Sequence, residues 1–263
     1  MTDLKQDEIN RETISDQKPD QPKNLRADAV ASDKEEITFA QRLRTETAQA
    51  HRFVESTNFV KGILRGVMDM ESFANMQAGM YLVYDALEEE LERHKDNPLV
   101  SQIHFPELSR KAVLERDLEF LYGEDWKNQL RMTSARKEYI DRIHWLGEND
   151  PGLLVAHSYT RYLGDLSGGQ VISKIARRSL GLEGRDGLRF FDFDEIEKAR
   201  IFKNEYRNRL NQLPLTDERS QQIIDEAKQV FALNQGLFEE LEGSWIRTLA
   251  NFLPMRSNRR KGA

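Results

Sequence analysis

His51 lies in a segment where three side chains of different chemistry are spaced to share one side of a helix. Arg44 comes seven residues before it and Glu55 four residues after it, which places all three near one helical stripe. At 1.5 Å per residue, Arg44 lies about 10 Å along the axis from His51. That separation suits a large flat cofactor with a metal centre and an acidic edge, with Glu55 orienting the imidazole. The spacing alone, however, favours an ordinary histidine beside a helix salt bridge.

The segment RYLGDLSGGQ at 161–170 places three glycines inside a long helical pattern. Gly164, Gly168 and Gly169 together should cost a helix about 2 to 3 kcal/mol relative to alanine. Gly164 and Gly168 are one turn apart, so they clear a strip on which a flat macrocycle can lie closely. A close helix crossing explains the strip equally well, and the pattern leaves both interpretations open.

Any metal would have to be held by histidine or carboxylate, because the chain has no cysteine. We find no paired Glu-x-x-His motif of the kind that di-iron helical bundles use. The nearest approach is a single Asp141-x-x-His144. The sequence therefore disfavours a di-metal oxidase.

The overall composition excludes several classes of protein. The net charge of −6 and the pI near 5.6 argue against a nucleic-acid-binding protein, whose binding face would be strongly basic. No window approaches the 18 apolar residues of a transmembrane helix, and the first thirty residues lack a secretory apolar core. We therefore expect a soluble cytoplasmic protein.

Helical periodicity runs through most of the chain, and we find no convincing run of alternating strand residues. The sequence therefore predicts an all-α fold with one main domain. The expected helices span residues 39–54, 70–94, 111–123, 133–147, 151–180, 193–212 and 217–241.

The two ends of the chain differ in composition from the middle. Residues 1–36 contain ten acidic and six basic residues and no aromatic residue, which predicts a disordered tail. We expect the main domain at 37–242. Residues 243–263 combine an apolar helical stripe with a basic end, and for these the pattern favours packing against the domain over a membrane surface or a partner.

Several segments together resemble the heme oxygenase family. They are TETAQAH at 45–51, ALEEELERHKDNP at 86–98, VAHSYTRYLGDLSGGQ at 155–170, FKNEYRNRLNQL at 202–213 and FALNQGLFEEL at 231–241. The similarity covers about residues 38–242. It implies an all-α fold that grips heme b between a proximal and a distal helix. It also implies an enzyme that uses O2 and electrons to open the heme ring to biliverdin, iron and carbon monoxide.

The resemblance also implies roles for the residues on the two faces of the heme. His51 corresponds to the proximal iron ligand and Glu55 to its neighbour. Gly164 and Gly168 match glycines of the distal helix, and Asp165 matches the carboxylate that organises water over the bound oxygen. The other members of that distal network correspond to Tyr84, Arg161 and Asn234.

A third group corresponds to the residues near the heme propionates: Arg44, Tyr159, Lys203 and Arg207. Arg44 stands where animal relatives tend to carry lysine, which keeps the charge but changes the geometry. Lys203 and Arg207 are four residues apart and share a helical face. Without the resemblance, a solvated basic face would be the favoured interpretation of that pair.

The remaining histidines and a phenylalanine cluster are interpreted as structural. We expect His157 to be a hydrogen-bonded core residue and His94, His104 and His144 to be structural or exposed. We expect Phe190, Phe191 and Phe193 to pack in the core.

Two other functions remain as alternatives. A heme carrier or sensor would keep the pocket without turnover, although Asp165 and both glycines argue against it. A thiamine-degrading hydrolase on the same scaffold needs a catalytic cysteine, which is absent. For the enzyme we expect a monomer that receives electrons from a ferredoxin or a flavoprotein reductase.

Overall fold

The computed structural model describes the backbone of residues 37–252 and the side chains of residues 37–242. This range is helical and contains no strand, so the all-α prediction is confirmed. The predicted tail at 1–36 and the basic end after residue 252 lie outside the described residues. The α-helices are α1 (Phe39–Glu46), α2 (Ala48–Glu55), α3 (Asn58–Leu64), α4 (Met70–Arg93), α5 (Val100–Ile103), α6 (Lys111–Tyr122), α7 (Trp126–Gln129), α8 (Ser134–Asn149), α9 (Leu154–Leu180), α10 (Ala199–Asn211) and α11 (Asp217–Phe252). Short 3-10 turns are η1 (Pro106–Leu108), η2 (Pro151–Leu153) and η3 (Arg189–Phe191).

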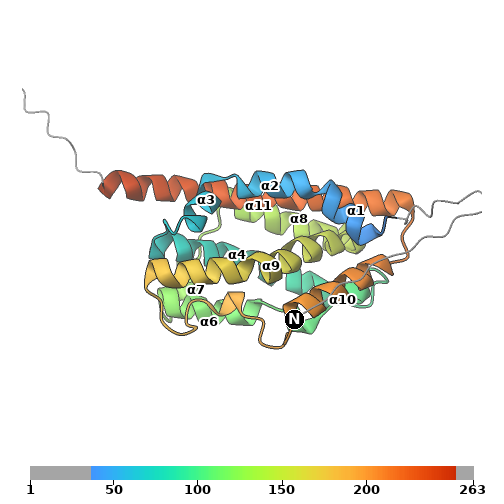
Figure 1. Ribbon diagram of the computed structural model, residues 1–263, viewed down its shortest axis with the longest axis horizontal. Helices are drawn as coiled ribbons and strands as arrows, with labels where there is room; N and C mark the ends of the chain where they lie inside the picture. Colours follow the sequence, from blue (N-terminus) through green and yellow to red (C-terminus); the bar gives the residue numbers. More distant parts are fainter. Residues whose placement is uncertain (1–36, 253–263) are drawn as a thin grey trace, which may run out of the picture. The chain divides into compact units, whose positions relative to one another are not determined.

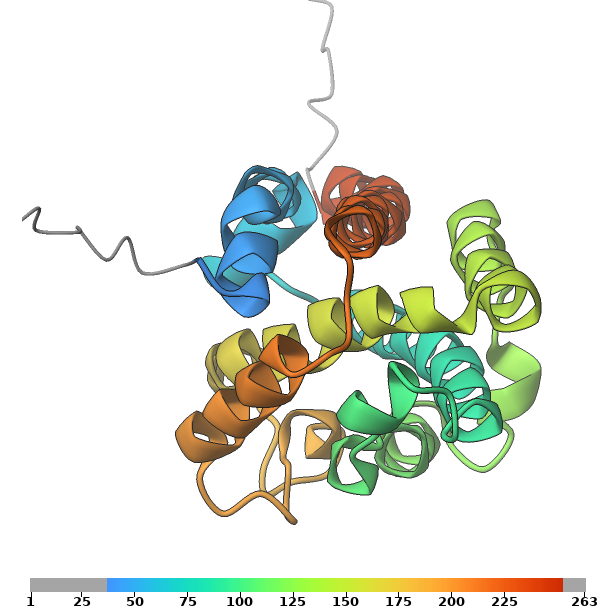
Figure 2. The ribbon, with the colours of Figure 1, turned by 90° about the vertical axis from the view of Figure 1, so that its right-hand side faces the viewer.

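The long helices α4, α9 and α11 form the centre of the fold. Helix α4 packs against α6, α8 and α9, and α11 also packs against α9. Figure 2 shows α1 to α3 and α11 side by side along one side of the molecule, with α9 crossing below them. The core between these layers includes fully buried side chains such as Tyr84, Leu87, Leu146 and Ile224.

Helix α2 contacts α11 along its length and its chain neighbours α1 and α3 at its ends. It packs on α11, whereas its neighbours in the chain reach the distal side: α3 packs against α9, and α1 packs against α10. Figure 1 shows α1, α2 and α3 as a chain of short helices running along α11 and past α9. The helix that carries His51 is therefore supported by α11, and none of its residues is buried.

The predicted helix at 39–54 is divided in two at Thr47. The buried Thr47 hydroxyl donates to the Leu43 carbonyl oxygen at 2.7 Å, a bond to the preceding turn that bends helices. At the other end, Thr38 and Gln41 form a capping box that fixes where α1 begins. The break gives α2 its own direction, which periodicity alone did not reveal.

Helix α9 runs without interruption through the glycine segment. It ends at Gly181, which adopts a left-handed backbone conformation with φ 65°, the common way to terminate a helix. Most residues from Leu154 to Leu163 are buried, whereas Gly164 and Ser167 are exposed. The helix thus changes from a core element to a surface-lining element at the glycines.

Two predicted boundaries differ from the structure. The helix predicted at 193–212 begins only at Ala199, because residues 192–198 form a connection that follows η3. Helix α11 extends to Phe252 and so passes the expected end of the domain at residue 242, which remains a prediction. None of the helices in residues 37–252 is long and apolar enough to cross a membrane.

Candidate active site

His51 presents a half-exposed imidazole on α2. Its side chain is 54% exposed, and its Nδ1 atom lies 3.6 Å from a Glu55 carboxylate oxygen. The ring of Phe231, on α11, meets the imidazole edge-on with ring centroids 5.5 Å apart. Because Nδ1 faces Glu55, Nε2 is the nitrogen that remains for a metal, and its orientation is set in the way that metal-binding histidines usually are.

The glycines of α9 separate into two kinds. A Cβ atom added at Gly164 or Gly168 would meet no heavy atom within 4 Å, whereas one added at Gly169 would lie 3.3 Å from Phe191 Cδ1. The close helix crossing is therefore wrong as an explanation for Gly164 and Gly168, since neither faces a neighbouring helix closely. These two leave an open strip, whereas Gly169 packs closely against the Phe191 side chain.

A buried polar network lies beside that strip. The Tyr84 hydroxyl, from α4, donates a short hydrogen bond to Asp165 Oδ2. Arg161 lies one turn before Asp165, with Nη2 3.4 Å from Asp165 Oδ1. Its Nη1 atom donates to Asn234 Oδ1 at 2.7 Å. Four residues that the sequence placed in one network are thus in contact, although they come from three helices.

The environment of this network sets which member can exchange a proton. Burial raises the pKa of the Asp165 carboxyl, although Arg161 and the Tyr84 hydroxyl both favour its ionised form. Burial and the neighbouring Asp165 raise the pKa of Tyr84 well above its usual value. Burial alone would lower the pKa of Arg161, but the adjacent carboxylate outweighs it and raises the pKa. Tyr84 therefore stays a neutral donor and Arg161 a cation, which leaves Asp165 as the member that titrates.

The four residues predicted at the heme edge come from α1, α9 and α10. Burial raises the pKa of the Tyr159 hydroxyl, whereas a hydrogen bond with Thr47 and the positive charges of Arg207 and Arg44 oppose that rise. Both cations therefore act electrostatically on this hydroxyl. Lys203, one turn before Arg207 on α10, reaches α9 and donates from Nζ to Ser167 Oγ at 3.2 Å. This edge is the part of the site with a clear positive charge, suited to carboxylates.

Sequence reasoning missed two residues of the site. The Met80 sulfur accepts a hydrogen bond from Arg161 Nη2 at 3.0 Å. Met80 lies four residues before Tyr84, so the helical spacing could have identified it. Phe231 lies three residues before Asn234 and contacts His51, and the same spacing argument applies to it.

The structural roles assigned to other residues hold. His157 is fully buried and its Nε2 atom lies 3.0 Å from Glu226 Oε1. Phe190 and Phe191 are buried in the core, and Phe193 packs against it. The fold and this site define a class of protein, an all-α protein that combines a half-exposed imidazole, an open glycine-lined strip on a second helix and a polar network beside that strip.

Comparison with known proteins identifies the family. The sequence model for heme oxygenase matches residues 37–240. A heme oxygenase of Porphyra purpurea is 47% identical over 212 residues, which cover 81% of this chain and 90% of that protein. Heme oxygenase 1 of Gallus gallus is 43% identical, with 84% of this chain and 73% of that protein covered.

Solved structures agree with the sequence comparison. The crystal structure of heme oxygenase-1 from the cyanobacterium Synechocystis in complex with heme superposes with a TM-score of 0.80 at 42% identity, covering 82% of this chain and 97% of that chain. The heme oxygenase of Leptospira interrogans gives a TM-score of 0.75 at 43% identity, covering 77% and 99%. The chain therefore belongs to the heme oxygenase family, and the predicted resemblance is confirmed.

Proposed function

We propose that the site described above opens the heme ring with O2 and electrons, giving biliverdin, iron and carbon monoxide, and that the named residues divide this work. The chain is an enzyme of heme catabolism, with heme as both substrate and cofactor. The observation that carries the residue assignment is the open strip at Gly164 and Gly168 beside the Tyr84–Asp165 hydrogen bond. A carrier would need the strip but not a carboxylate with a raised pKa next to it.

His51 would hold the iron through Nε2, with Glu55 keeping the ring oriented. Gly164 and Gly168 would allow the backbone of α9 to approach the opposite face of the ring. Bound heme supplies the iron that activates O2 and the ring carbon that is oxidised, so the protein has to supply orientation and electrostatics.

The edge cations would fix which way the heme lies. Arg44 and Arg207 act electrostatically on the Tyr159 hydroxyl, and Lys203 donates to Ser167 of α9. Their positive charge complements the two propionates, and an asymmetric set of cations favours one rotation of the ring over the others. Orientation in turn determines which ring carbon faces the distal network.

Asp165 would deliver protons on the distal side. Its raised pKa brings the carboxyl closer to neutral pH, where a general acid is most effective. Arg161 and Asn234 hold the network in place from α9 and α11, and Tyr84 holds one carboxylate oxygen. A carboxyl fixed in this way can position a water toward the cofactor and pass a proton through it.

We further propose that electrons come from a ferredoxin or a flavoprotein reductase and that the chain acts as a cytoplasmic monomer. A protein donor is favoured because the His51 and Arg44 side chains are exposed, and Lys203 and Arg207 are partly exposed. An exposed cofactor edge allows electron transfer from a docked protein.

The test is a hemin titration followed by turnover. Purified protein should take up one hemin, and adding ferredoxin with its reductase under air should remove the Soret band while a bilin band and a ferrous-chelator signal appear. A stable heme spectrum under the same conditions would instead support the carrier or sensor. Analytical ultracentrifugation at the assay concentration tests the monomer.

A further inference from the structure

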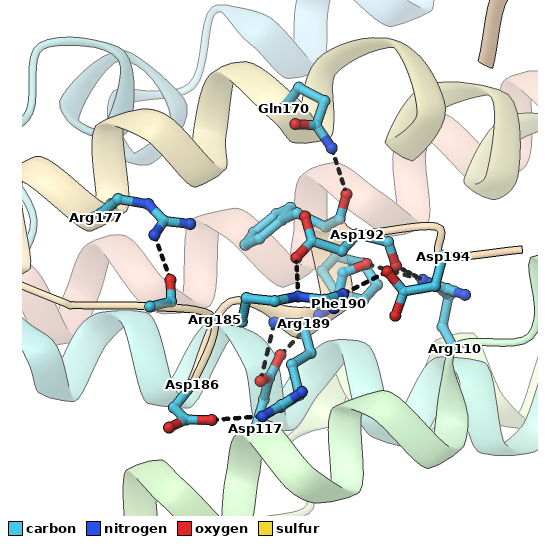
Figure 3. A network of polar contacts seen from close by, with 12 residues as sticks. Arg110, Asp117, Gln170, Arg177, Arg185, Asp186, Arg189, Phe190, Asp192 and Asp194 are labelled. Carbon is cyan, nitrogen blue, oxygen red and sulfur yellow. Dashed lines mark hydrogen bonds and ion pairs between the residues drawn. The ribbon is translucent and has the colours of Figure 1, made fainter. Parts of the chain in front are cut away.

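The connection between α9 and α10 is fastened to three helices behind the distal site. Gln77 on α4 donates to the Gly187 carbonyl oxygen at 2.6 Å, and Gln170 on α9 donates to that of Phe191 at 2.8 Å. Arg110, at the start of α6, donates to the Asp192 carbonyl oxygen at 2.7 Å. Figure 3 shows Gln170 and Arg110 reaching this connection from different helices. Side chains of three helices therefore hold the backbone of this loop.

Asp117 makes the central contact of this group. Its side chain is fully buried on α6. One carboxylate oxygen accepts from the Arg189 backbone N–H at 3.0 Å and the other from the Phe190 N–H at 2.7 Å. A carboxylate that binds two successive backbone donors sets both the position and the rotation of that peptide segment.

The segment so fixed places an aromatic ring against the distal network. The ring of Phe190 meets the Tyr84 ring edge-on, with centroids 5.7 Å apart. Both side chains are buried. Tyr84 is the residue whose hydroxyl holds Asp165, so a shift of Phe190 would change the space in which the Tyr84 ring is held.

The next residue of the segment supports the distal helix itself. Phe191 lies where a Cβ on Gly169 would be only 3.3 Å from its Cδ1 atom. It also stacks with Phe73 of α4 at 6.4 Å between centroids. Phe191 therefore limits how closely α9 can approach this connection at Gly169, the residue after Gly168.

We propose that Asp117 is a positioning residue for the distal carboxylate, acting through the backbone of Arg189 and Phe190 and the Phe190 ring to keep the Tyr84 hydroxyl on Asp165. This inference rests on the proposed role of Asp165 in proton delivery. Asp117 touches neither the open strip nor any edge residue in the contacts described above, so it acts only through others. Replacing its carboxylate should leave heme binding intact and disturb proton delivery.

Asp117→Asn is the direct test, because the amide has one acceptor oxygen for two backbone donors. Asp186→Asn is the matched control. Asp186 lies in the same connection and is about half exposed, and its carboxylate binds the Arg189 side chain at 2.7 Å. The Asp186→Asn substitution removes the same charge and leaves the bonds from Asp117 to the backbone unchanged.

In Asp117→Asn, the backbone amides of Arg189 and Phe190 should exchange with solvent faster in the heme-free protein. With hemin bound, affinity from the Soret titration should stay within about 3-fold of wild type. The pKa of the ferric heme-bound water should move by about half a unit or more, because that water reports on distal hydrogen bonds. Bilin yield per heme consumed should fall by about 10- to 100-fold. Asp186→Asn should match wild type in all four measurements.

A variant with faster amide exchange but an unchanged water pKa and bilin yield would overturn the inference. If Asp117→Asn fails to fold by circular dichroism, Phe190→Leu decides the matter, since it keeps the backbone contact and removes only the ring against Tyr84. Phe190→Leu should show the same shift in the water pKa, and a wild-type value there would overturn the inference. Failure of the wild-type protein to form bilin would instead contradict the proposed function.

Discussion

The two sides of the candidate site are built in opposite ways. On the proximal side, α2 contributes no buried side chain, and His51 is 54% exposed. On the distal side, Tyr84, Arg161 and Asn234 are buried and bonded into one network around Asp165. The difference suits the two tasks proposed for these sides, which are to bind the iron and to deliver protons. An axial ligand is held in place by the bond that it forms to iron, whereas proton delivery requires dipoles that are fixed before the reaction begins.

The largest effect expected from this comparison is at His51. His51→Ala should abolish bilin formation, because the four other histidines, all within the described residues, lie against Glu90, Glu92 or Glu226. It should also change the spectrum of bound hemin. Because the side chain is half exposed, the free energy of unfolding of the heme-free protein should change by no more than about 0.5 kcal/mol. Turnover, the Soret spectrum and urea denaturation measure the three quantities.

His157→Ala is the control for that experiment. His157 is fully buried and bonded to Glu226, so its loss should destabilise the heme-free protein by about 1 to 3 kcal/mol while hemin coordination stays normal. Normal turnover by His51→Ala without added imidazole would remove His51 from the iron and end the contrast between the two histidines.

The second effect concerns the distal carboxylate. Asp165→Ala should reduce the rate of bilin formation by about 100-fold or more, since a positioned general acid contributes that much. Hemin affinity should hardly change, because Asp165 lies beside the strip rather than at the edge cations. Single-turnover spectra and a Soret titration separate the two parameters.

Tyr84→Phe sharpens the same point, because it removes only the hydroxyl that donates to Asp165. It should give a smaller loss of rate than Asp165→Ala. Undiminished bilin formation in Asp165→Ala would show that protons reach the cofactor by another route.

The third prediction uses the glycines, whose roles differ within one helix. Gly164→Ala should stabilise the heme-free protein by about 0.5 to 1 kcal/mol, because alanine favours the helix and the added Cβ meets no neighbour. It should weaken hemin binding by about 1 to 3 kcal/mol if the ring packs on that strip. Thermal melts of the heme-free protein and hemin titrations give both values.

Gly169→Ala is the matched substitution, and it should have the opposite effect on the stability of the heme-free protein. Its Cβ would press on Phe191, which is buried and cannot move away easily, so the heme-free protein should lose stability. Hemin affinity that is equal in Gly164→Ala and wild type would show that the ring does not lie against this part of α9.

Sequence periodicity predicted most of the helices, because each long helix has a clear apolar face. It could not predict the division at Thr47, which depends on one hydroxyl bonding back to Leu43. It also could not predict that α10 begins at Ala199, because residues 187–192 are fixed by side chains from distant helices. Such contacts leave no periodic signal.

For the site, the helical spacing suggested the His51 stripe and the glycine strip but left the ordinary interpretations open. The network around Asp165 came from the resemblance to the heme oxygenase family, since Tyr84 and Asp165 are 81 residues apart. Asp117 shows what neither approach found. In the sequence it is one acidic residue in a charged helix, and only its burial and its two backbone bonds distinguish it.

The smallest effect is expected at the exposed edge. Lys203→Ala removes one cation and its bond to Ser167. Because partly exposed ion pairs contribute about 0.2 to 1 kcal/mol, hemin affinity should fall by only about 2- to 5-fold, while the ratio of biliverdin isomers, measured by chromatography, changes more clearly. Arg209→Ala is the control, since Arg209 lies on the same helix but binds Glu205 at 2.8 Å. An isomer ratio that shifts equally in both variants would mean that the net charge of α10 orients the ring. A shift in Lys203→Ala alone would mean that the ring is oriented by the cation at the junction of α10 with α9.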